Sequence, residues 1–475
     1  MNTSEAINEL VGGLGELSGL GAKDTKVSKK TEADMATAIV NKMSALPFRC
    51  GEDGFYYYYN HRYGLIKDQE LKKVISGVMK RLKIGNVYQF GSIAGTFNML
   101  KNEASIKIFE PQRRIISFKN CVLDMSDYTR HDHDPQWMTR IGFGFDYDPN
   151  AKCLEWLRFL DYVIPDESSR RVFQEFLGLM FIDSDELSVA TALYLYGTGS
   201  NGKSVVEGVI RGMLGDDYCS NYELSQLCNS QSSDYLLADV NGKLLNFAVD
   251  MGDKEFSGGR YKALAAREPI MARPIGREPI KVKELPLLIS NINKIPVITD
   301  SSDGFWRRFK IIHFPRKIEA KDQDARLGSK LRLEFSGIFN WIIEGRKRLM
   351  DNDGHFTRSE YMERMATEIR MESNSVLSYT MDSGYVANKV DGSVYSEVKV
   401  LSRTFMEQYK EYCLMNNYKP KSSRSVVSDL TLSGFEYRKV LRVDGDVSSG
   451  FIFYKLESSA AIDNSLDDIS DSLPF

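Results

Sequence analysis

The chain has 475 residues, a formal net charge of −3, and 42% hydrophobic and 27% charged residues. This length allows several domains, and the composition is that of a globular protein that does not coat nucleic acid indiscriminately. No apolar run reaches the length of a membrane span, and the N-terminus lacks the pattern of a signal peptide. The six cysteines form no C-x-x-C pair, so neither a zinc site nor a disulfide framework is indicated, and we expect a cytoplasmic protein.

The N-terminal third is predicted to hold a flexible tail over 1–46 and a mixed α/β region over 47–185. The predicted strands of this region are Gly54–Asn60, Ile106–Phe109 and Ile115–Leu123, and its predicted helices are Leu154–Val163 and Glu167–Phe181. The run Tyr56–Tyr59 favours a strand with one packed face over a platform for stacking bases. His131-Asp132-His133 favours a polar loop over a metal site, because no further ligand cluster lies nearby in the sequence.

A loop in the middle of the chain matches the pattern G-x-x-x-x-G-K-[ST] at every fixed position. Its residues are Gly197, Thr198, Gly199, Ser200, Asn201, Gly202, Lys203 and Ser204. The glycines let backbone N–H groups approach a polyphosphate, Lys203 can reach the β and γ oxygens, and the Ser204 hydroxyl can ligate Mg²⁺. An apolar strand is predicted over 190–196 and an amphipathic helix over 205–214, which is the setting that phosphate binding requires.

Three later segments supply candidate partners for this loop. Residues 243–250 predict a strand ending in Asp250, a carboxylate for Mg²⁺, with Asp253 and Glu255 as alternatives and a solvated Asp as the simpler interpretation. Residues 285–293 predict a buried strand ending in amides that can orient water near the γ-phosphate. Arg307 and Arg308 precede another strand, and an arginine delivered to a neighbouring subunit's nucleotide stabilises charge, although paired arginines commonly form surface ion pairs.

Two basic segments are candidate DNA contacts. Residues 258–284 carry seven basic residues against three acids, and the runs Ile270–Ile275 and Pro279–Lys283 predict a hairpin, here named the basic hairpin, with Arg277 at its tip. After a polar stretch at 351–385, predicted to be a linker, the order helix, helix, strand, strand predicts a winged helix-turn-helix over 386–456. The cations expected to meet phosphates are Arg273, Arg277, Lys281, Lys283, Lys421 and Arg424. A surface hairpin with no partner and a small packing domain are the alternatives.

The last segment, residues 457–475, has five acids, no basic residue and a Pro-Phe ending. Its apolar content is too low for folding, so it is predicted to be a disordered acidic tail. Three roles stay open: competition with DNA, docking of a replication partner, and solubility alone.

Taken in order, these motifs resemble a superfamily 3 helicase of the phage and plasmid replication type, related to the poxvirus primase-helicases. The resemblance rests on the loop Gly197–Ser204, the strand ending in Asp250, the basic segment 262–283, Asn293-Lys-Ile-Pro296 and the block from Gly304 to Pro315. It implies an AAA+-like P-loop motor domain with a parallel sheet over 186–350, between the mixed α/β domain and the winged helix. It also implies ATP and Mg²⁺ as ligands.

Carried over to this sequence, the resemblance implies that Lys203 and Ser204 hold phosphate and Mg²⁺ and that Asp250 is the second acid of the Mg²⁺ site. Asn293 matches the sensor position, with Asn291 as the alternative. Arg308 matches the arginine finger, with Arg307 beside it. Many relatives end the acid strand in Glu, and many carry a primase. The short segment 1–46 leaves no room for a primase, so priming is not expected.

The function expected from these motifs and their resemblance is ATP-dependent unwinding of DNA during replication of a phage or mobile element, by a homohexameric ring in the bacterial cytoplasm. The partners expected are single-stranded and forked duplex DNA, further copies of the chain, and a separate primase, polymerase or single-strand-binding protein. Alternatives are an origin-binding initiator and an ATP-driven translocase that remodels DNA without unwinding. A metabolic P-loop kinase is disfavoured, because it has little use for a basic hairpin or a winged helix.

Overall fold

The structure is a computed structural model that describes residues 48–51, 54–66, 68–81, 90–101, 111–229, 233–249, 258–274, 279–293, 303–372, 374–389, 394–416 and 418–456. The predicted tail 1–46, the predicted strand 106–109 and the acidic tail 457–475 lie outside the described residues. Within those ranges, no helix is long and apolar enough to cross a membrane.

A five-stranded sheet in the order β14-β8-β13-β10-β9 lies at the centre of the molecule, and each strand is parallel to its neighbours. Its strands are β8 (Ala192–Tyr196), β9 (Cys219–Ser220), β10 (Leu245–Ala248), β13 (Leu287–Ile292) and β14 (Phe309–His313). The sequences are short apolar runs, and β13 is buried along its whole length. Such runs form parallel strands because helices cover both faces of the sheet. The predicted α/β fold with a parallel sheet is therefore confirmed.

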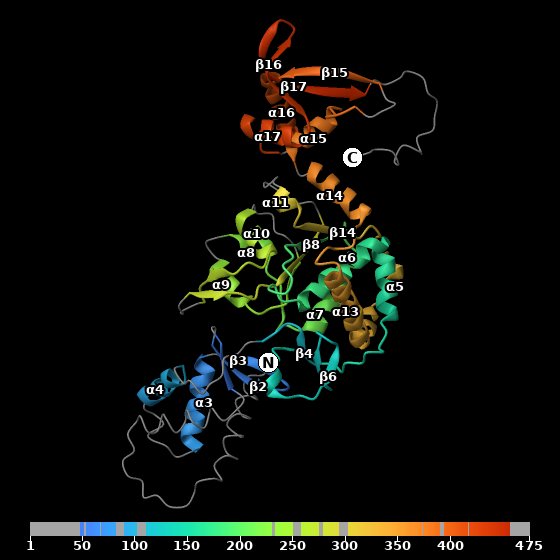
Figure 1. The fold of residues 1–475 in the computed structure, drawn as a ribbon. Coiled ribbons are helices and arrows are strands. Elements are labelled where there is room, and N and C mark those ends of the chain that lie inside the picture. Colours follow the sequence, from blue (N-terminus) through green and yellow to red (C-terminus); the bar gives the residue numbers. More distant parts are fainter. Residues whose placement is uncertain are drawn as a thin grey trace, which may run out of the picture.

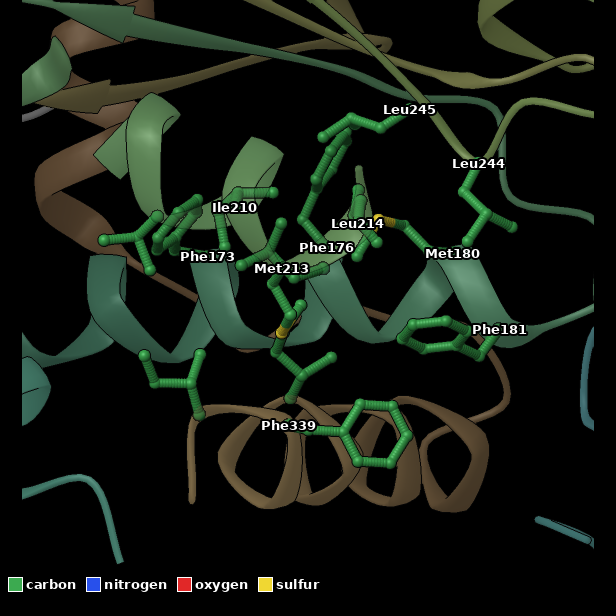
Figure 2. Close-up of a cluster of buried hydrophobic side chains, with 14 of the residues drawn as sticks. Phe173, Phe176, Met180, Phe181, Ile210, Met213, Leu214, Leu244, Leu245 and Phe339 are labelled. Atoms are coloured by element: carbon green, nitrogen blue, oxygen red, sulfur yellow. The ribbon is translucent and has the colours of Figure 1, made fainter. Parts of the chain in front are cut away.

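The two faces of this sheet belong to two hydrophobic cores, because successive residues of a strand point to opposite sides. On β8, Leu193 and Leu195 enter the first core, and Ala192 and Tyr194 enter the second. Helices α5 (Leu154–Val163), α6 (Glu167–Gly178), α7 (Lys203–Leu214) and α13 (Phe335–Asp351) close the first core, part of which is drawn in Figure 2. Helices α8 (Leu224–Cys228), α9 (Ser233–Asp239), α10 (Gly258–Ala265) and α14 (Glu360–Glu372) contribute to the second.

Upstream of α5 and α6, the described residues form two small sheets and two α-helices. The first sheet is antiparallel, β1 (Phe48–Gly51), β2 (Gly54–Tyr59) and β3 (Arg62–Ile66), and is followed by α3 (Asp68–Arg81) and α4 (Phe90–Lys101). The second has the order β6-β5-β4-β7, with β4 (Ile115–Ser117), β5 (Val122–Asp124), β6 (Thr129–His131) and β7 (Ile141–Gly142). The strand predicted over 115–123 is thus a hairpin of two strands, because the N–H of Phe118 bonds the carbonyl of Cys121 at 2.8 Å.

Two further predictions in this region are tested by burial and contacts. The tyrosine run lies on β2 as predicted, but Tyr56 and Tyr57 are both buried, so both faces of the strand are covered there and not one. His131 accepts or donates a bond with Thr129 Oγ1 at 2.8 Å, whereas His133 bonds the carbonyl of Phe118 at 2.8 Å. Among the described residues, no group of three or more His, Cys, Asp or Glu is placed to hold a metal.

The C-terminal part packs around its own core. It comprises α15 (Ser375–Asp382), β15 (Tyr395–Leu401), α16 (Ser402–Met415), α17 (Ser423–Leu432), β16 (Glu436–Val443) and β17 (Asp446–Leu456). The sheet is antiparallel in the order β15-β17-β16, and β15 is a strand that the sequence pattern did not predict. Figure 1 shows this part at the far end of the molecule from β2 and β3. The range 351–385, predicted to be a linker, contains α14 and α15.

Candidate functional site

The loop between β8 and α7 has the backbone that its sequence predicts. Gly199 and Gly202 have φ of 103° and 91°, and Ser200 has φ of 49°. Gly197 admits no larger residue, because an added Cβ would lie 2.7 Å from the carbonyl oxygen of Phe314. Helix α7 begins at Lys203 without a side-chain cap, so the first N–H groups of the helix are left for another acceptor. A helix start of this kind favours an anion.

Lys203 lies under this loop and is 5% exposed. Its ammonium donates to the carbonyl of Gly197 at 2.5 Å and to Oδ1 of Asn293 at 3.0 Å. Burial lowers the pKa of Lys203 from its ordinary value. The structure therefore brings the predicted sensor Asn293 into direct contact with the loop lysine.

Asn291, the alternative sensor, has a different partner. Its Nδ2 donates to Oε2 of Glu207 at 3.2 Å, and its buried Oδ1 has no hydrogen-bond partner among the described residues. Glu207 lies on α7, one turn after Ser204, and burial raises the pKa of its carboxyl. The Ser204 hydroxyl and the Glu207 carboxylate are hard oxygen donors of the kind that Mg²⁺ prefers. Asp250 lies outside the described residues, just beyond the end of β10.

A cavity of about 820 Å³ opens beside the loop. The loop lines one side together with Asn293, and α5 and the segment 318–327 line the rest. Helix α5 touches the loop directly, because a Cβ added at Gly202 would lie 2.9 Å from Cγ1 of Val163 and 3.0 Å from Cζ of Phe159. No sequence motif predicted this wall. Phe159 and its neighbours follow the spacing of an amphipathic helix, which indicates a core face and nothing more.

The two adjacent arginines have opposite environments. Arg308 is 8% exposed, and its Nη1 donates to the carbonyl of Gly304 at 2.5 Å. Arg307 is exposed, and it lines a hollow of about 410 Å³ with Lys310 and Arg358. In this structure Arg307 can meet another molecule, and Arg308 is held inside its own subunit.

The basic hairpin forms with β11 (Ile270–Ala272) paired antiparallel to β12 (Ile280–Val282). Ala272 and Val282 lie in the second core, so Met271 and Lys281, which alternate with them along the strands, lie on the opposite side of the hairpin. Lys281, Lys283 and Arg273 are exposed, and Met271 lies opposite Lys281 on the same side. Arg277, predicted at the tip, lies outside the described residues.

The two predicted DNA contacts of the C-terminal part also differ from each other. Nζ of Lys421 lies 2.7 Å from Oδ2 of Asp429, whose side chain is 5% exposed, and 3.2 Å from Oδ1 of Asn374. Arg424, near the start of α17, is exposed. Lys421 therefore connects the segment before α17 to Asn374, which precedes α15, and to Asp429 of α17. Arg424 is available to a partner.

Two families match parts of the chain. Residues 27–165 match a family described as "D5 N terminal like", and residues 195–308 match a family of unknown function, DUF5906. The structural alignment with the solved apo form of the NrS-1 C-terminal region covers 90% of this chain and 100% of the NrS-1 chain. Its TM-score is 0.48 and the sequence identity is 13%.

Curated viral proteins are similar as well. "Putative helicase L207/L206" of Acanthamoeba polyphaga mimivirus is 26% identical over 254 residues, which are 51% of this chain and 26% of that protein. "Putative helicase 121R" of Invertebrate iridescent virus 3 is 23% identical over 235 residues, which are 47% of this chain and 25% of that protein. The matched span is thus a small part of each relative. The chain is related to the viral superfamily 3 primase-helicases, as its motifs indicated.

Proposed function

We propose that the protein is an ATP hydrolase that uses the energy of hydrolysis to unwind DNA during replication. The observation that carries the proposal is the contact between the Lys203 ammonium and Asn293 at the mouth of a glycine loop. A loop of this form binds polyphosphate, and an amide at the end of the adjacent strand is placed to sense the terminal phosphate. The relatives named as helicases support the same function.

In this proposal the loop residues Gly197–Ser204 hold the phosphates of ATP. Lys203 exchanges its contacts with Gly197 and Asn293 for phosphate oxygens, and Asn293 is freed to orient a water. Ser204 and Asp250 would hold Mg²⁺, which would neutralise charge on the phosphates. The oxygen donors beside Ser204 fit that ion.

We further propose a homohexameric ring, in which each nucleotide lies between two subunits. The residue that reaches the neighbour's nucleotide is assigned to Arg307, because it is exposed while Arg308 is buried. The resemblance to superfamily 3 helicases favours Arg308 for this role. Single substitutions at Arg307 and at Arg308 would decide between the two. An arginine in this role stabilises charge that develops during phosphoryl transfer.

DNA would be held by two surfaces. The outward cations of the basic hairpin would line the ring's central channel and contact phosphates without reading sequence. The order of α16, α17, β16 and β17 supports the proposal of a winged helix over 386–456, with Arg424 as a phosphate contact. We propose the domain boundaries that the sequence motifs predict. The α/β domain covers residues 47–185, and the motor domain follows it in the sequence over 186–350.

The decisive experiment is strand displacement on a forked duplex by the purified chain. Lys203→Ala should lower ATP turnover by about 100-fold or more and abolish displacement, because a buried cation aimed at the phosphates is lost. Lys399→Ala, which removes an exposed lysine paired with Glu397 on β15, is the matched control and should leave both activities intact. Hydrolysis of ATP with DNA present but without displacement would favour a translocase instead.

An origin-binding initiator is the second candidate, and the C-terminal part supports it by its element order. An initiator would protect one DNA sequence from cleavage whether or not ATP is hydrolysed. A footprint at a single site that persists in Lys203→Ala would therefore favour the initiator over the helicase.

A further inference from the structure

The cavity beside the phosphate loop extends well past the residues that would hold phosphates. Its far side is formed by Tyr162 at the end of α5 and by the segment that follows β14. Tyr162, a large aromatic residue, is 43% exposed and lies on the exposed side of α5, whose buried side is formed by Trp156, Phe159, Leu160 and Val163. None of the motifs predicts a role for this residue, and the proposed hydrolysis does not use it.

Both walls of this far side are fixed to the loop. Val163 and Phe159 of α5 contact the position of Gly202, and the N–H of Ile318 donates to the carbonyl of Ser200 at 2.6 Å. Tyr162 follows within the same turn of α5 as Phe159. The phosphate loop, the ring of Tyr162 and the segment 318–327 therefore line one continuous cavity.

The chemistry of the walls changes along the cavity. At the loop end lie backbone N–H groups and Lys203, which attract anions. At the far end Arg158 is already neutralised by Glu155 at 2.6 Å, and Asp324 is paired with Lys330 at 2.7 Å. Tyr162 has the guanidinium of Arg316 over its ring, 4.9 Å from the centroid, and no aromatic ring of the described residues packs against it.

We propose that this far end is the subsite for the nucleobase, and that the base stacks on the ring of Tyr162. Aromatic side chains bind bases through their π-faces, and the ion pairs of Arg158 and Asp324 leave these two side chains with little attraction for a second phosphate. This inference rests on the proposed function, since it assumes that the triphosphate of the same ligand occupies the loop. It makes α5, a helix upstream of the motor, part of the ATP site.

The test compares ATP with inorganic tripolyphosphate, which has the phosphates but no base. Tyr162→Ala and Tyr162→Leu should weaken ATP binding by about 5- to 150-fold, the range that corresponds to the loss of one base–aromatic stack. Neither variant should change tripolyphosphate binding. Tyr162→Phe keeps the ring and should bind ATP as the wild type does. Tyr235→Ala, at an equally exposed tyrosine of α9, is the control.

The outcomes separate this inference from the proposed function. Unchanged ATP binding in Tyr162→Ala and Tyr162→Leu would overturn the base subsite, as would equal weakening of ATP and tripolyphosphate. Melting temperatures decide whether a variant is folded, and Tyr162→Leu retains apolar bulk if Tyr162→Ala does not fold. A wild-type chain that binds tripolyphosphate and ATP equally would also overturn the subsite. Failure of the proposed phosphate site is different, because the wild type would then bind neither ligand, and failure of unwinding is detected separately by strand displacement.

Discussion

Lys203 in the phosphate loop and Lys281 in the basic hairpin carry the same charge, yet their surroundings are opposite. Lys203 is buried and held by two hydrogen bonds, whereas Lys281 is exposed on the outer side of a two-stranded sheet. A buried cation has already lost its water and is held in place, so it can act on charge at one defined point. An exposed cation attracts phosphates in many positions. The same contrast separates Arg308 from Arg307 and Lys421 from Arg424, and mutations at these pairs test it.

The largest effect is expected at Arg307. Arg307→Ala should lower ATP turnover by about 1,000-fold or more with ATP binding retained, because the residue would act only on the transition state. Arg308→Ala should instead lower the free energy of unfolding by about 1–3 kcal/mol, since it removes a buried hydrogen-bonded group. Turnover, ATP affinity and melting temperature measure the three quantities.

Mixing inactive subunits sharpens this test. Lys203→Ala and Arg307→Ala subunits should recover part of the turnover when they are assembled together, because some interfaces then hold both intact residues. Mixed assemblies without recovery would argue against a site shared between subunits. If Arg308→Ala has normal stability but loses ATP turnover, Arg308 and not Arg307 is the residue that acts on the neighbouring subunit's nucleotide.

Lys421 and Arg424 should separate stability from DNA binding. Lys421→Met removes the ion pair with the buried Asp429 and should destabilise the C-terminal part by about 1–3 kcal/mol. Arg424→Ala should leave the melting temperature unchanged and weaken duplex binding. Thermal unfolding measures the stability of both variants, and titration with duplex DNA measures their affinity for it. Normal stability of Lys421→Met would contradict the structural role given to this lysine.

In the basic hairpin, Lys281→Ala combined with Lys283→Ala should flatten the salt dependence of DNA binding. Removing one lysine–phosphate pair reduces the slope of log affinity against log salt by about one. Met271→Ala, on the same side of the hairpin, leaves every charge in place and should keep the full slope. ATP hydrolysis without DNA should be unchanged in both. An unaltered slope in the double variant would mean that the hairpin does not meet DNA.

The smallest effect is expected at His61, whose ring stacks on His133 with centroids 3.8 Å apart. Burial and the nearby His133 lower the pKa of His61. Between this lowered pKa and the ordinary value near 6.5, the unfolded chain binds more protons than the native one, so stability falls as the pH drops through that window. His61→Asn, which suits the positive φ, should reduce the pH dependence of the melting temperature, as measured by thermal unfolding across this pH window.

Local patterns were enough to predict the elements that surround the phosphate loop. The helix 154–163, the strand before the loop and the helix after it form where the apolar patterns place them, because burial on one or both faces fixes their period. The contact between Lys203 and Asn293 was also foreseeable, since adjacent parallel strands end at one edge of the sheet.

Other features depend on contacts that a sequence pattern does not carry. Strand β15 was missed because its burial alternates only weakly and its partner β17 lies far along the chain. The burial of Arg308 follows from Gly304 and the neighbouring core, and nothing in two adjacent arginines says which one turns inward. The sequence pattern identifies Tyr162 only as a residue of an amphipathic helix. It does not predict that Tyr162 lines the cavity beside the phosphate loop.

The first core has one further consequence. Residues from α6, such as Phe173 and Phe176, pack with Ile210 of α7 and Phe339 of α13 without a break (Figure 2). A cut at residue 185 or 186, where the motifs divide the chain, would pass through this core and expose both halves. The part proposed to hydrolyse ATP is then smaller than the part that shares this core. The helices before the loop therefore belong to the same folding unit as the loop itself.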